Sequence, residues 1–267
     1  MKNILLLIHD DDGQEARLQA ALDVARAVNG HLACLDIVVV PPIGGDDVGL
    51  SSGAMLLDIE RTKERANEAR IKSRLAREDV AWNWINPDDF LQPAIRSASD
   101  LADLIVVSSE FPDLPLLDAR RLAGNVALKS GKPVLAVPAK ARGLNVTGDV
   151  LVAWDGSDPA SAAVTAATPL LKLAALITLF EVRDASSRAT IEDAATYLSR
   201  YSIRCDVVSE IASSRQVSTL ILERAELGSY AYLVAGAYSK PPLVEALFGG
   251  VTRDLLRSCK IPLLLAH

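Results

Sequence analysis

The residues best suited to chemistry lie near the end of the chain, in a glycine-rich stretch that runs from Gly236 to Thr252. The letters Gly-Ala-Tyr-Ser at 236–239 are followed by nine residues and then by Gly-Gly-Val-Thr at 249–252, where a helix is expected to begin. Glycines at a helix start let backbone N–H groups approach an anion, and the helix dipole adds a partial positive charge. The stretch is a phosphate cradle in outline. The alternative, that these glycines only turn the chain, stays open.

Other patterns that could carry chemistry are weaker. No Walker-type G-x-x-x-x-G-K-[ST], no Rossmann G-x-G-x-x-G at a first helix and no G-x-S-x-G is present. His9 and the three acids at 10–12 favour a solvated helix start over a metal site, because a helix N-terminus attracts acids. Ser157 or Asp158 is expected to cap a helix in which Pro159 takes the first position. We therefore predict neither a catalytic residue nor a metal ligand.

Composition excludes several classes of protein. The chain has 267 residues, of which half are hydrophobic, a formal net charge of -6 and three cysteines. It is too apolar for a disordered chain and too poor in cysteine for a disulfide scaffold, and its acidic balance argues against a nucleic-acid partner. The apolar stretch at 170–180 is shorter than the roughly 20 residues of a membrane span, and the start lacks the pattern of a signal peptide. We expect a cytoplasmic protein with reduced cysteines and no membrane partner.

An internal repeat organises the chain. The run Ile-Leu-Leu-Leu-Ile-His-Asp at 4–10 returns as Val-Leu-Val-Ala-Trp-Asp at 150–155, and Ser-Gly-Lys-Pro-Val-Leu at 130–135 resembles the segment that begins at Ser258. The first half is longer, and its extra residues fall in the Pro/Gly-rich loop at 41–55. The turn residues of 140–148 form the linker, so we predict one domain at 1–142 and a second at 143–267.

Each half alternates short β-branched runs with helical patterns, which predicts an α/β fold. Strands are expected at 2–8, 32–39, 80–85, 103–108 and 133–138, and again at 149–154, 175–182, 203–209, 231–236 and 261–266. Crossover helices between consecutive strands imply parallel pairing. The prediction is two tandem, doubly wound domains, each with a five-stranded parallel sheet. The highly charged stretch 60–79 is expected to be an exposed helix with opposite charges at helical spacing.

These features resemble the universal stress protein family, and the whole chain looks like a tandem, two-domain member. The stretch from Gly236 to Thr252 is similar to the family signature, a glycine, two residues, a glycine, nine residues, and a glycine followed by Ser or Thr. The spacing is intact, but Ser239 replaces the second glycine and Gly250 replaces the hydroxyl residue. The resemblance implies an adenine nucleotide alpha hydrolase-like fold. It also implies that ATP or a related adenine nucleotide, with or without Mg²⁺, contacts residues of the second half: Asp155, Val182, Gly236, Ser239, Gly249, Gly250 and Thr252.

The first half departs further from the signature. It has Ser108-Ser109-Glu110 where the second half has Gly236, and Arg121-Leu122 where the second half has the glycine pair. Glu110 would repel a phosphate, so the first half is interpreted as a degenerate copy that binds no nucleotide.

The resulting hypothesis is a stress-response or regulatory module that binds an adenine nucleotide in its second domain. The alternative is a nucleotide-independent interaction protein with vestigial sites, which recruits an unknown protein partner through sheet edges or the 41–55 loop. Slow ATP hydrolysis stays open, although no base or arginine finger is evident. The resemblance further implies that 134–139 and 263–267 pair antiparallel inside the chain. Such an intramolecular pseudo-dimer could act as a monomer or form a further homodimer.

Overall fold

Ten strands form one sheet in the computed structural model, which describes residues 1–36, 62–86, 91–109, 126, 130–183, 190–212, 216–237 and 250–267. In chain order the strands are β1 (Asn3–Ile8), β2 (His31–Asp36), β3 (Ala81–Ile85), β4 (Leu104–Ser108), β5 (Val134–Val137), β6 (Val150–Trp154), β7 (Ile177–Arg183), β8 (Asp206–Ile211), β9 (Tyr232–Gly236) and β10 (Leu263–Ala266). Each predicted strand is confirmed, with ends that shift by a few residues, and residues 37–39 of the predicted strand 32–39 lie outside the described part of the chain.

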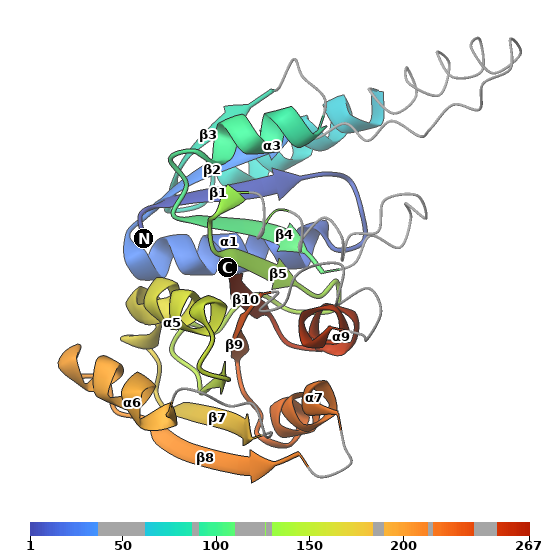
Figure 1. Cartoon of the computed structure of the whole chain (residues 1–267). Helices are drawn as coiled ribbons and strands as arrows, with labels where there is room; N and C mark the ends of the chain where they lie inside the picture. The colour runs from blue at the N-terminus through green and yellow to red at the C-terminus, as the bar shows by residue number, and fades with distance from the viewer. Residues whose placement is uncertain are drawn as a thin grey trace, which may run out of the picture.

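The order of the strands across the sheet is β3-β2-β1-β4-β5-β10-β9-β6-β7-β8 (Figure 1). Counted from either outer edge toward the middle, each half therefore repeats one order, with its third, second, first, fourth and fifth strands side by side. All pairs within a half are parallel. Strands that are buried on both faces have nearly continuous apolar sequences, and β1, β4, β6 and β9 are such strands. The predicted doubly wound α/β fold is confirmed.

The two halves meet through β5 and β10, which pair antiparallel at the centre of the sheet (Figure 1). Leu135 lies opposite Leu264, with Ala136 opposite Leu263 and Val134 opposite Leu265. The side chains of both strands are buried. The expected antiparallel pairing inside one chain is confirmed.

Helices cover both faces of the sheet. They are α1 (Gln14–Val28), α3 (Leu91–Ser99), α5 (Asp158–Leu171), α6 (Ile191–Arg200), α7 (Val217–Leu227), α9 (Val251–Ser258) and the helical residues 62–75. One apolar core lies under α1, α5, α6 and residues 62–75, and a second lies under α3, α7 and α9. Each core contains residues of both halves, so the apolar packing continues across the junction between β5 and β10.

Local sequence signals explain where several helices begin and end. Ser157 caps α5, because its hydroxyl accepts a hydrogen bond from the Ala160 N–H at 3.2 Å, and Pro159 follows in the first turn. Asn29 ends α1 in the left-handed conformation with φ 47°. None of the helices in the described ranges is long and apolar enough to cross a membrane.

The described part of the charged stretch, residues 62–75, is helical, and Lys72 pairs with Glu68 at 2.5 Å. Arg74 contacts Glu78 at 3.4 Å and also pairs with Glu15 of α1. The expected helix with internal ion pairs is confirmed for these residues. Its inner face is less apolar than expected, because Glu64 is only 3% exposed.

Replacing Leu264 by proline should destabilise both halves together. Because β10 has a neighbour on each side, a proline there removes a ladder hydrogen bond or distorts the strand. Hydrogen exchange measured by mass spectrometry should show faster exchange in β4 as well as in β9. Ile211→Pro, on the outer strand β8, is the control and should affect the second half alone. Unchanged protection of β4 in Leu264→Pro would contradict a cooperative junction.

Candidate functional site

Three of the predicted site residues lie at the carboxyl ends of neighbouring strands in the second half. Val182 is near the end of β7, Asp155 follows β6 directly, and Gly236 ends β9. The register places Trp154 beside Glu181 and Val152 beside Val234, so these strand ends lie at one edge of the sheet. In open α/β sheets ligands bind at this edge, where the strand order reverses. The fold therefore brings these three residues into one region.

Side chains around this edge are held by local contacts. The Asp155 side chain is exposed, and its Oδ1 accepts a hydrogen bond from the Ser157 N–H at 3.0 Å, which fixes the turn into α5. Val182 is buried. The indole N–H of Trp154 is also buried and has no hydrogen-bond partner in the described part of the chain. An unsatisfied buried donor costs roughly 1–3 kcal/mol, so this group favours a polar partner at the edge.

Gly236 permits a close approach between β9 and the start of α5. A Cβ atom at this position would lie 2.6 Å from the Ala160 backbone nitrogen and 2.8 Å from the Pro159 carbonyl carbon. Real Cβ atoms do not approach backbone atoms this closely, so a larger residue would push α5 away from the strand. The glycine is required by packing, whether or not a ligand is bound.

The start of α9 supplies the second part of the predicted cradle. Gly250 is the N-cap residue with φ -93° and ψ 138°, and it offers no side chain to cap the first amides. Thr252 is buried in the first turn. The Asp254 carboxylate accepts a hydrogen bond from the Ser218 hydroxyl of α7 at 2.8 Å. Ser239 and Gly249 lie outside the described residues, so their placement stays a prediction.

In the first half, the Arg17 side chain fills the region at the carboxyl ends of β1 and β4. This side chain is fully buried, and its guanidinium donates to the Leu7 carbonyl oxygen at 2.8 Å and pairs with Asp11 at 2.9 Å. It also donates to the Ser108 hydroxyl at the end of β4. Gly13 lies against Ser108 at the end of β4, and Pro159 lies against Gly236 at the end of β9. Four residues further along the helix stand Arg17 in the first half and Ala163 in the second. Glu110, Arg121 and Leu122 lie outside the described residues.

The prediction that residues 9–12 form a solvated helix start is wrong for His9 and Asp11. His9 is buried, and its Nδ1 lies 2.6 Å from Oε1 of Glu64, which is also buried. The Asp11 carboxylate is buried by its pairing with Arg17, whereas Asp10 and Asp12 are exposed. The reason is tertiary, because the helical residues 62–75 cover this end of β1. No cluster of His, Cys, Asp or Glu within the described ranges could hold a metal ion.

Asp36, the last residue of β2, lies in the same buried region. Its side chain is 8% exposed, and Oδ1 has no hydrogen-bond partner in the described part of the chain. Burial raises the pKa of Asp36 to about 7, and the negative charges of Glu64 and Glu68 contribute in the same direction. Burial alone would lower the pKa of His9, but the hydrogen bond and charge of Glu64, with the charge of Asp11, raise it. Sequence reasoning missed this cluster.

No protein-family model and no curated protein sequence matches the chain. Among solved structures, a universal stress protein from Archaeoglobus fulgidus is 17% identical, with a TM-score of 0.70 over 99% of this chain and 95% of that one. A functionally unknown protein from Pseudomonas aeruginosa PAO1 is 18% identical, with a TM-score of 0.60 over 100% of this chain and 92% of that one. A candidate universal stress protein from Pseudomonas aeruginosa UCBPP-PA14 is 18% identical, with a TM-score of 0.61 over 100% of this chain and 93% of that one.

The chain has the universal stress protein fold. The likeness extends over both halves, which agrees with the family resemblance drawn from the glycine-rich stretch. At these identities the likeness shows the fold alone.

Within this universal stress protein fold, Asp36→Asn should change the pH dependence of stability. The folded-state pKa of about 7 exceeds the ordinary value of 3.8, so the stabilising contribution is fully present below pH 3.8 and is lost as the pH rises through 7. The asparagine variant should lack this loss of stability, which is on the order of 1.4 kcal/mol per pH unit between the two pKa values. Urea denaturation at several pH values between 4 and 8 measures it. Asp12→Asn, at an exposed position, is the control, and equal profiles for the two variants would refute the assignment.

Gly236→Ala should lower stability by about 1–3 kcal/mol, because its methyl group would overlap the backbone of α5. Urea denaturation measures the free energy of unfolding, and circular dichroism checks that the variant folds. Ser161→Ala, at an exposed position of α5, is the comparison and should change the stability by less than about 0.5 kcal/mol. A Gly236→Ala variant as stable as the wild type would show that α5 is not held this close to β9.

Proposed function

We propose that the chain is a universal stress protein-like module that binds one adenine nucleotide, ATP or a relative, at the carboxyl edge of its second half. The observation that carries the proposal is the contrast between the two halves at equivalent positions. In the first half, the Arg17 guanidinium lies at the end of β1. At the matching positions, the second half has Ala163 in α5 and Gly236 at the end of β9. The helix that follows the first strand of the second half, α5, therefore places no guanidinium at this strand end.

The chemistry of the second-half edge suits a nucleotide. The N-cap residue of α9 is a glycine without a capping side chain, so the amides at this helix start can be offered to phosphate oxygens, and the helix dipole favours negative charge there. The unpartnered indole N–H of Trp154 offers a donor to the polar groups of a base or ribose. Asp155 is exposed and can accept hydrogen bonds from ribose hydroxyls. The Asp254 carboxylate opposes a phosphate, but it is turned toward the Ser218 hydroxyl.

The proposed role is binding and regulation. ATP or its relative, with or without Mg²⁺, would act as a ligand that reports the energy state of the cell. A stress response and a cytoplasmic location follow from the resemblance and belong to the proposal. A protein partner that responds to the bound form also belongs to it.

Gly250→Glu should abolish nucleotide binding. A carboxylate at the start of α9 would crowd the first amides and repel phosphate, which costs several kcal/mol at short range and partial burial. Calorimetric titration with ATP, ADP and AMP should give one site per chain for the wild type and none for this variant. Leu227→Glu adds the same charge at an exposed position at the other edge of the sheet and should bind normally.

Three outcomes would contradict the proposal. Two sites per chain would mean that the Arg17 position also accepts a nucleotide. Unchanged affinity in a folded Gly250→Glu variant would remove α9 from the site. A wild type that binds none of the three nucleotides would instead favour the interaction protein with vestigial sites.

A further inference from the structure

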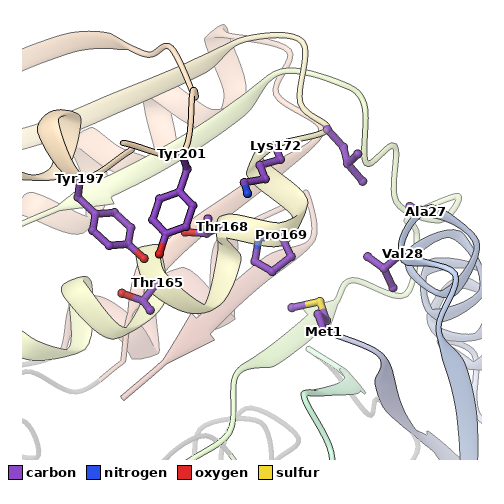
Figure 2. Close-up of a pocket in the computed structure, with 10 residues that line it drawn as sticks. Met1, Ala27, Val28, Thr165, Thr168, Pro169, Lys172, Tyr197 and Tyr201 are labelled. Carbon is purple, nitrogen blue, oxygen red and sulfur yellow. The ribbon is translucent and has the colours of Figure 1, made fainter. Parts of the chain in front are cut away.

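A groove lies between the two halves (Figure 2), and none of its lining residues belongs to the proposed nucleotide site. It has a volume of about 450 Å³ and is lined by the last turn of α1, the end of α5 and residues of α6. Pockets for small molecules commonly measure about 300–1,000 Å³ and favour the interfaces between domains. In the second half these lining residues precede β7 and β8, so the groove lies at the amino ends of these strands. The nucleotide site lies at their carboxyl ends.

The groove carries a positive charge and no negative one. Lys172, at the end of α5, is the charged side chain among its lining residues, which include no Asp or Glu. No carboxylate in the described part of the chain forms an ion pair with Lys172. Its ammonium instead lies 4.9 Å from the centre of the Tyr201 ring. A cation held over an aromatic ring, and not neutralised by an acid, is available to an anion.

Phenol and hydroxyl groups line one side of the groove. The rings of Tyr197 and Tyr201 have centroids 5.1 Å apart, and Figure 2 shows their hydroxyls directed toward Thr165 and Thr168 of α5. Burial raises the pKa of Tyr197, but hydrogen bonds to Tyr201, Thr168 and Thr165, with the charge of Lys172, lower it on balance. These hydroxyl groups and Lys172 together form the polar lining of the groove.

The opposite side is apolar and comes from the first half. Met1 and Val28 face Pro169 across the groove (Figure 2). The C-terminal carbonyls of α1 would repel an anion, but Lys2 Nζ donates to the carbonyl oxygens of Val28 at 2.5 Å and Asn29 at 3.0 Å. The groove thus joins an apolar wall to a cationic rim.

We propose that this groove binds a small organic anion with an apolar or aromatic body, such as an aryl or aliphatic carboxylate or sulfonate. The anionic group would lie beside Lys172 and the tyrosine hydroxyls, and the apolar body would lie against Pro169 and Val28. Because the walls come from both halves, the bound molecule would hold the halves together and stabilise the whole chain.

The test uses two fluorescent probes of similar shape on the full chain. 8-Anilinonaphthalene-1-sulfonate carries a negative charge, and N-phenyl-1-naphthylamine is its neutral counterpart. The wild type should bind the sulfonate at one molecule per chain. Lys172→Met should lower the affinity for the sulfonate by about tenfold or more and should change the affinity for the neutral probe by less than about twofold. Lys140→Met, at an exposed lysine outside the groove, is the matched control and should change neither.

A second variant separates the groove from other apolar surface. Ala27→Phe places a ring in the groove from α1 and should abolish binding of both probes, while circular dichroism shows the native fold. ATP should not displace either probe, because the proposed sites lie at opposite ends of the second-half strands. Equal sulfonate affinity in Lys172→Met and Lys140→Met, retained binding in Ala27→Phe, displacement by ATP, or no saturable single site would each overturn the proposal.

Discussion

The antiparallel pairing of β5 with β10 is the contact on which the rest of the structure depends. A parallel sheet of five strands has an open edge on each side, and unpaired N–H and C=O groups at an edge invite pairing with another chain. Here the two inner edges satisfy each other, with Leu135 opposite Leu264. The sheet continues from one half to the other, and so do the apolar cores on its two faces. Neither half can separate without exposing both a strand edge and buried side chains.

The two halves solve one packing problem in different ways. In each, the helix after the first strand approaches the end of the fourth strand so closely that one partner must be a glycine. The first half places glycine in the helix start, where a Cβ at Gly13 would lie 2.7 Å from the Ser108 hydroxyl oxygen, and the second half places it in the strand, at Gly236. The position of this glycine differs between the halves, and so do the side chains at the carboxyl end of the fourth strand. In the first half Ser108 and Asp11 hold the Arg17 guanidinium, and the second half has no charged side chain at the matching helix position.

The buried ionic groups of the first half carry an energetic cost that their mutual contacts offset. Removing one partner of a buried ion pair costs about 3–5 kcal/mol, because the other charge is left without compensation. Arg17 with Asp11 and His9 with Glu64 are such pairs, whereas Asp36 has no partner in the described residues and holds its proton up to a pKa of about 7. The same end of the sheet thus holds the Arg17–Asp11 and His9–Glu64 pairs in the first half, whereas in the second half the buried Glu181 pairs with Arg183. The two halves therefore share one strand order and differ in the groups that fill this end of the sheet.

The sequence by itself determined the strands, the internal repeat and the positions of Asp155, Val182 and Gly236 at strand ends, because apolar runs, turn residues and helix caps act over a few neighbouring residues. The pairing of β5 with β10 came from the family resemblance, and the ladder bears it out. Only the tertiary structure decided that His9, Asp11 and Arg17 lie in the interior. Residues 9–12 have the local pattern of a solvated helix start, and their burial depends on partners far away in the chain, such as Ser108 for Arg17 and Glu64 for His9. The groove beside Lys172 has the same origin, since its walls come from helices of different halves and no local pattern records which helices meet.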